Sequence, residues 1–208
     1  MPDPVGTRPL HLWSLRGDVV VEQGEGDGDL VLRGSWGTER IANADPLVRE
    51  ALRRMELGPV LLANVEARRE PGGDRPGSYF VLLPTLVRLS HLLVRSLGLD
   101  DFKGPLLSVS PLSPDAFFAP VRLPARRRVR LPAGASLTLE PAGAGLALES
   151  SGSAHRVVLH RPEAAWVAGL LAWPVTPDAA SARLPLPPEV TAGILDYLAA
   201  AGMAAPVG

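Results

Sequence analysis

Three basic side chains, Arg88, His91 and Arg95, lie three and four positions apart in a leucine-rich segment. On a helix this spacing places them on one face, beside the leucine face. Such a row of cations can hold an acidic peptide segment through charge complementarity. It is also what the solvated face of any amphipathic helix shows, and that is the simpler interpretation.

The sequence offers little for catalysis or for metal binding. There are no cysteines, which excludes disulfides, thiolate metal sites and cysteine nucleophiles. His155 and His160 are an odd number of positions apart, so in a strand they point to opposite faces and cannot share one metal. No Gly-x-Ser-x-Gly motif is present to position a serine nucleophile. We therefore predict neither a metal site nor a catalytic residue.

A cluster of glycines and acids over residues 24–29 invites comparison with phosphate-binding and calcium-binding loops. A dinucleotide-binding loop leads from a strand into a helix, whereas the sequence after this cluster has the alternation of a strand. A calcium loop counted from Glu25 would need a carboxylate at its twelfth position, and that position is Trp36. The cluster is therefore interpreted as a polar hairpin turn.

The charge balance argues against nucleic acid as a partner. The 21 basic and 22 acidic residues give a net charge of −1, so the chain lacks the positive field typical of nucleic-acid-binding proteins. The densest basic run, Arg126 to Arg128 with Arg130, is interpreted as a solvated linker, although it could also contact phosphate or an acidic peptide. Residues 1–9 have no apolar core of a signal peptide, and no segment has the pattern of a membrane span. We expect a cytoplasmic protein that binds no membrane.

Strands followed by helices are predicted for the first half. Asp45 is a good helix N-cap, with Pro46 at the first helical position and Gly58-Pro59 as a stop. Leucines from Leu82 to Leu97 recur at helical spacing up to Gly98. The expected elements are a hairpin over 17–33, a strand over 38–42, helices over 46–57, 60–69 and 82–98 with a loop over 70–77, and a strand over 104–112.

The second half appears as an internal repeat of the first. A shift of 116 positions places Leu32 on Leu148, Arg40 on Arg156 and Pro46 on Pro162. Strands are expected over 137–139, 146–148 and 156–159, a helix from Pro162, and a last helix over 190–201. We predict an α+β fold of two tandem winged-helix-like units, each a small antiparallel sheet followed by three helices. Their bounds are 1–114 and 131–208, with a linker over 115–130.

Several segments resemble the amino-terminal region of SagB-type dehydrogenases, the flavin enzymes that oxidise azolines to azoles in thiazole/oxazole-modified peptides, including thiopeptides. These segments are 29–32, 36–37, 45–52, 104–112, 146–150 and 157–162. In that family the region precedes a nitroreductase-like domain that binds FMN, and this sequence ends at Gly208, where that domain would begin. The resemblance implies a non-catalytic accessory subunit of a hetero-oligomer that binds precursor peptide, scaffolds the flavin subunit, or does both. FMN would then bind a separate nitroreductase-like partner and not this chain alone.

The predicted unit also resembles the peptide recognition elements of ribosomal-peptide biosynthesis. There a leader peptide adds as a strand beside the third strand and packs on the third helix. Carried onto this chain, the resemblance implies a peptide-binding surface made of Arg40, Ile41, Arg88, His91 and Arg95. The second copy would bind a peptide likewise through Arg156 to Leu159, or would only dock the partner.

Two other functions compete with this interpretation. A winged-helix DNA-binding regulator would require salt-dependent binding to promoter DNA, against which the charge balance argues. A small stand-alone enzyme would require turnover by the isolated chain, for which no positioned nucleophile, acid or base is evident in the sequence.

Overall fold

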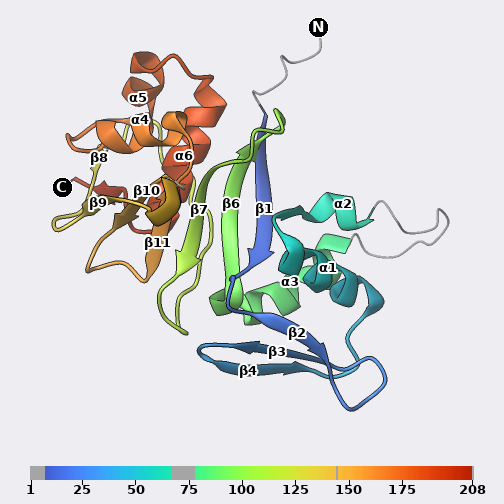
Figure 1. Ribbon diagram of the computed structural model, residues 1–208. Helices are drawn as coiled ribbons and strands as arrows, with labels where there is room; N and C mark the ends of the chain where they lie inside the picture. The colour runs from blue at the N-terminus through green and yellow to red at the C-terminus, as the bar shows by residue number, and fades with distance from the viewer. Residues whose placement is uncertain (1–7, 67–77, 144, 208) are drawn as a thin grey trace, which may run out of the picture. The chain divides into compact units, whose positions relative to one another are not determined.

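Two compact units make up the computed structural model, which describes residues 8–66, 78–143 and 145–207 (Figure 1). The first unit contains Leu12–Arg95. The second contains the described residues of Met1–His11 and Ser96–Gly208. Two strands, β1 (Pro9–Leu15) and β6 (Leu93–Leu99), contribute residues to both units. The fold is α+β with antiparallel sheets, as predicted.

The first unit contains a three-stranded antiparallel sheet in the order β2-β3-β4 (Figure 1). The strands are β2 (Val20–Gln23), β3 (Leu30–Gly34) and β4 (Gly37–Ile41). The glycine-rich cluster forms the turn between β2 and β3, where the Gly24 amide donates to the Asp29 carbonyl over 2.9 Å. The predicted hairpin turn is therefore confirmed.

Helix α1 (Pro46–Leu57) follows the sheet and begins as the sequence predicts. The Leu47 amide donates to the Asp45 carboxylate over 2.7 Å, which satisfies one of the amides that a helix leaves unpaired at its N-terminus. The elements after α1 are β5 (Val60–Leu61), α2 (Leu62–Glu66), α3 (Ser78–Arg88) and the 3-10 turn η1 (Ser90–Leu92). Apolar side chains from the sheet, α1 and α3 form the core, including Leu32, Leu52, Met55, Leu82 and Leu86.

The predicted helix over 82–98 is wrong in its second half. Helix α3 ends at Arg88, and β6 follows the 3-10 turn. Leu93 and Leu97 are four positions apart, a spacing that suits one face of a helix and also one face of a strand. The periodicity alone could not distinguish the two. The strand is favoured because β6 has strands on both sides, so its backbone groups are paired and most of its side chains are buried.

The second unit contains the strand order β7-β11-β10-β9, all antiparallel. Its strands are β7 (Pro105–Pro111), β9 (Ser136–Leu139), β10 (Leu146–Glu149) and β11 (His155–Leu159). Helices α4 (Pro162–Leu170), α5 (Pro177–Arg183) and α6 (Pro188–Ala200) follow β11 in the chain (Figure 1). Two short strands, β8 (Val129–Arg130) and β12 (Ala205–Pro206), form a separate pair.

The element order repeats along the chain. Strand β9 begins 116 residues after β2, β10 begins 116 residues after β3, and α4 begins 116 residues after α1. In each half three antiparallel strands are followed by three helices. The halves differ at one edge: β4 is a terminal strand of its sheet, whereas its counterpart β11 pairs on its far side with β7.

Some elements differ from those predicted. Strand β1, helix α5 and strand β12 have no predicted counterpart, and β8 lies inside the predicted linker. The helix predicted from residue 60 begins at Leu62, because Val60 and Leu61 form β5. The predicted loop over 70–77, the end of the short helix beyond residue 66 and the terminal residues 1–7 lie outside the described residues. The strands predicted for the second half and the helix at Pro162 are confirmed.

The described helices are short. The longest, α6, has 13 residues, whereas about 20 apolar residues are needed to cross a bilayer. Within the described ranges, no helix has the length and apolar character of a membrane span.

His155 makes the stability of the second unit depend on pH. Its ring is buried against Phe118, with 5.8 Å between ring centroids, and burial lowers the pKa of His155 below its usual value of 6.5. The unfolded chain therefore takes up the proton first. The contribution of the neutral, buried His155 ring to the stability of the second unit is fully present above pH 6.5. As the pH falls below 6.5, this contribution is lost by up to about 1.4 kcal/mol per pH unit.

Urea unfolding at pH 7.5 and 5.5 measures this effect. We expect the wild-type protein to lose stability at the lower pH and His155→Leu to lose much less. Equal losses in the two proteins would show that His155 is not the group responsible.

Candidate binding site at a strand edge

Strand β4 exposes backbone hydrogen-bonding groups along its outer edge. The Arg40 carbonyl accepts a hydrogen bond from Arg88 Nη2 over 3.2 Å, so this carbonyl points away from β3. In an antiparallel strand the amide and carbonyl of one residue point the same way, and this direction alternates along the chain. The backbone groups of Thr38 and Arg40 therefore face outward, and the same alternation applies to Ala42. In the described part of the chain no strand pairs with this edge.

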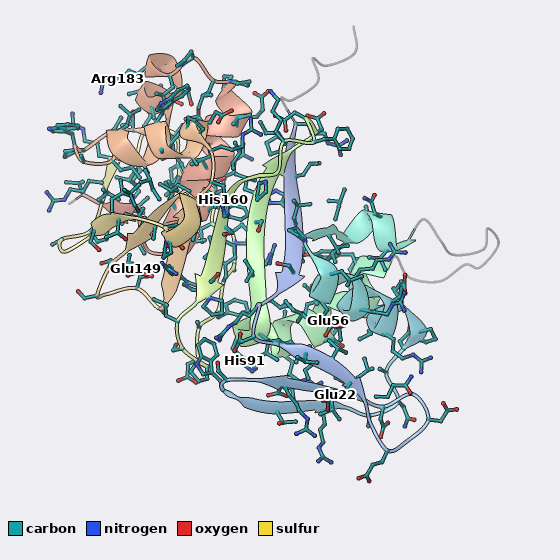
Figure 2. The ribbon with its side chains drawn as sticks, viewed as in Figure 1. Glu22, Glu56, His91, Glu149, His160 and Arg183 are labelled. Carbon is teal, nitrogen blue, oxygen red and sulfur yellow. The ribbon has the colours of Figure 1, made fainter. Side chains whose placement is uncertain are left out.

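Basic side chains gather at this edge. Arg88 is the last residue of α3, and its guanidinium lies against the β4 backbone. His91 follows in the 3-10 turn, with its Nε2 3.7 Å from a carboxylate oxygen of Glu39 (Figure 2). The exposed Arg40 side chain makes no ion pair or hydrogen bond with any described residue. Two arginines and a histidine thus border the edge, with one acid among them.

A shallow cavity of about 320 Å³ adjoins Arg40 on the outward face of the three-stranded sheet. Val31 lies in the middle strand, β3, and its side chain is almost fully buried. Glu22 and Arg33 flank it and pair with each other over 2.7 Å (Figure 2). Arg33 is thus already neutralised by Glu22, whereas Arg40 is available to an anion from outside.

The opposite edge of the same sheet is blocked. The Val21 amide of β2 donates to Glu56 Oε1 of α1 over 2.9 Å (Figure 2). Capping of exposed edge groups by side chains is one way in which proteins prevent unwanted strand pairing. On β4 the corresponding contact comes from Arg88. Its guanidinium caps the Arg40 carbonyl and does not cap the outward amides of the strand.

Arg95 does not belong to this site. It lies in β6 and is buried, and its guanidinium carbon is 3.2 Å from the centre of the Trp13 ring. This cation–π contact stabilises the interior of the first unit. The predicted single helical row of Arg88, His91 and Arg95 is therefore wrong, because the helix ends before His91 and β6 turns Arg95 into the core.

Arg156, which the 116-residue shift of the sequence aligns with Arg40, is not available in the same way. The strand pairing instead matches Arg40 with Val158, because Val31 pairs with Arg40 and its counterpart Ala147 pairs with Val158. Arg156 lies in β11 and forms ion pairs with Glu140 and with Glu149, the latter at 2.7 Å. Strand β7 pairs with β11 along its whole length, from His155 to Leu159. An incoming peptide could not add to this edge without displacing β7.

No family model matches this chain. No curated protein matches it either. Within the described residues, no group of three or more histidine or acidic side chains is placed to hold a metal ion. The geometry of the β4 edge is therefore the main support for a function.

The resemblance implies a surface of Arg40, Ile41, Arg88 and His91, without Glu39 or Glu56. Ile41 is buried in the core of the first unit, so its side chain does not lie on this surface. Glu39 is the acid that His91 approaches, and its place on the predicted strand was a usable signal. Glu56 lies 35 residues from Val21, and nothing in the local sequence indicates that the two meet.

Proposed function

We propose that this protein is a peptide-binding subunit in which the outer edge of β4 holds an extended, acidic peptide segment as an added strand. The observation that carries the proposal is the open edge itself, where outward backbone groups of Thr38 and Arg40 lie beside the side chains of Arg40, Arg88 and His91.

Strand addition suits this edge physically. Backbone hydrogen bonds to Thr38 and Arg40 would give affinity that depends little on peptide sequence. Arg88 would exchange its hydrogen bond with the Arg40 carbonyl for a carboxylate of the peptide, which forms a stronger, charge-assisted bond. Arg40 offers a second cation that no described residue neutralises. The preference for acidic peptides follows from these two arginines.

We further propose that the peptide is the leader of a precursor in thiazole/oxazole-type peptide biosynthesis. In this proposal the chain is a non-catalytic, cytoplasmic subunit of an FMN-dependent azoline dehydrogenase complex. Two observations support it: the resemblance of segments such as 104–112, and the order of three strands then three helices in both halves, which suits tandem winged-helix-like, peptide-recognition units. FMN would bind a separate nitroreductase-like subunit.

Peptide binding is tested by fluorescence anisotropy with two labelled eight-residue probes. One alternates valine with glutamate, and the other alternates valine with lysine. We expect the glutamate probe to bind at least about tenfold more tightly. Arg40→Ala and Arg88→Ala should each weaken it about five- to tenfold, as expected for loss of one charge-assisted hydrogen bond.

Arg33→Ala is the matched control because Arg33 lies on the same sheet but is paired with Glu22. This variant should bind the glutamate probe as tightly as the wild type does. Equal affinity for the two probes, or an equal effect of all three substitutions, would contradict a specific acidic-peptide site at β4.

The proposed place in a flavin complex has its own test. The chain is co-expressed with a candidate nitroreductase-like protein from the same gene neighbourhood, and the complex is purified through a tag on this chain. We expect the flavin absorption and the azoline oxidation to accompany the complex. A yellow preparation of this chain alone, or oxidation of an azoline by it alone, would overturn the proposal.

A further inference from the structure

We infer that the second unit already holds its own guest strand, because β7 occupies on β11 the place that a peptide would take on β4. This inference rests on the proposed function. It adds that, in the described part of the chain, the β4 edge stays vacant while the equivalent β11 edge is filled, and that the guest on β4 is antiparallel, in the register of β7.

The two edges are equivalent by the internal repeat. The 116-residue shift relates β2 and β3 to β9 and β10. The last strand follows a shift of 118, because Val31 pairs with Arg40 whereas its counterpart Ala147 pairs with Val158. Both β4 and β11 pair with the preceding strand of their unit on one side. Only on the other side do they differ, since β11 there pairs with β7.

The β7–β11 pair defines the register that transfers to β4. Ser108 lies opposite Val158 and Ser110 opposite Arg156. Just beyond β7, the Leu112 amide donates to the Ala154 carbonyl over 2.8 Å. The shift of 118 turns Val158 into Arg40 and Arg156 into Thr38, two positions whose backbone groups face outward on β4. It likewise turns His160, whose amide donates to the Leu106 carbonyl, into Ala42.

Strand β7 is a permanent occupant of its edge. Its Leu107 and Val109 side chains are buried in the core of the second unit. The amides of His160 and Arg161 both donate to the Leu106 carbonyl, at 2.9 and 3.2 Å. A strand anchored by core side chains and backbone bonds does not exchange with a peptide from solution.

The guest on β4 should differ from β7 at one position. Opposite Val158, β7 carries the uncharged Ser108. The equivalent position on β4 is Arg40, whose side chain has no ion-pair partner among the described residues. A guest with an acidic side chain opposite Arg40 would supply the counter-charge. The substrate class is therefore an antiparallel strand with an acid at the position of Ser108.

The absence of cysteines makes disulfide trapping a clean test. The probe is a synthetic peptide with the sequence of residues 104–112 in which glutamate replaces Ser108. Versions of it carry Leu106→Cys or Ser110→Cys. The protein carries Ala42→Cys or Thr38→Cys, and Arg156→Cys, the equivalent of Thr38, is the matched control on the occupied edge. Opposed residues of neighbouring strands lie within the Cα separation that a disulfide spans.

We expect the Leu106→Cys peptide to link to Ala42→Cys and the Ser110→Cys peptide to Thr38→Cys, at least tenfold more than the exchanged combinations. Arg156→Cys should not link. Predominant linking in the exchanged combinations would mean a parallel guest, and linking at Arg156→Cys would mean that β7 leaves its edge. Either result overturns the inference.

Failure of the inference can be told apart from failure of the proposed function. If the valine–glutamate probe binds through Arg40 but the 104–112 peptide links nowhere, the peptide-binding function stands and the β7 template is wrong. If neither peptide binds, both proposals fail.

Discussion

Replacing Arg161 by alanine is expected to lower the free energy of unfolding by about 3 kcal/mol. Arg161 bridges Asp101, 2.9 Å away in the turn before β7, and Glu163, 2.6 Å away in the first turn of α4. All three side chains are largely buried. Burial raises the pKa of Asp101 and Glu163, but hydrogen bonds, including those from Arg161, hold both below their usual values. Without Arg161, two partly buried carboxylates lose their counter-charge.

Chemical denaturation of Arg161→Ala measures this loss, with Arg33→Ala as control. Arg33 forms an ion pair with Glu22 at 2.7 Å, a distance similar to those in the Arg161 network, but both side chains are about half exposed. Exposed pairs contribute about 0.5 kcal/mol. Similar losses in the two variants would show that the Arg161 network is no stronger than a surface ion pair.

Gly145→Ala is expected to destabilise the second unit by about 3 kcal/mol, through backbone strain and a steric clash. Gly145 precedes β10 and has φ +127°, a conformation that alanine rarely adopts. A Cβ atom there would clash with the Leu159 carbonyl oxygen of β11. Because the clash is with backbone, it can be relieved only by moving β10 away from β11.

Gly143→Ala separates strain from clash. Gly143 also has a positive φ, of +73°, but no atom lies within 4 Å of a Cβ built there. We expect a loss of about 1 kcal/mol from strain alone. Melting both variants side by side tests the difference. If Gly143→Ala proves as damaging as Gly145→Ala, the contact with Leu159 is not the cause.

The sequence predicted the elements that are set by local signals. The Asp45 cap and Pro46 located the start of α1, and the glycine-rich turn located the β2–β3 hairpin. Proline again marked the start of α4 at Pro162. These features depend on residues that are neighbours in the chain, so they can be found without knowledge of the tertiary structure.

The errors concern elements that are set by long-range packing. Strand β6 was predicted as helix because its leucines fit both periods, and only its position between two other strands decides the matter. Strand β1 was missed because Pro9–Leu15 shows no strict alternation of polar and apolar residues. The pairing of β7 with β11 joins residues about 50 positions apart, and no local pattern indicates it.

The candidate site was predicted in part. The resemblance placed Arg88 and His91 beside the strand that holds Arg40, and the structure brings these residues together, although by a turn rather than along one helix. Arg95 and Arg156 were assigned to peptide binding by spacing and by the repeat. Arg95 is excluded from the site because it is buried against Trp13. Arg156 is excluded because it is ion-paired and lies on a strand edge that β7 occupies.

Amide hydrogen exchange with and without the valine–glutamate probe tests the β4 edge most directly. On saturation with the probe, the amides of Thr38 and Arg40 should exchange at least about tenfold more slowly, since each would donate to the added strand. The Val21 amide, already bonded to Glu56 on the opposite edge, should not change. Unchanged exchange at Thr38 and Arg40 in the saturated complex would contradict strand addition at β4.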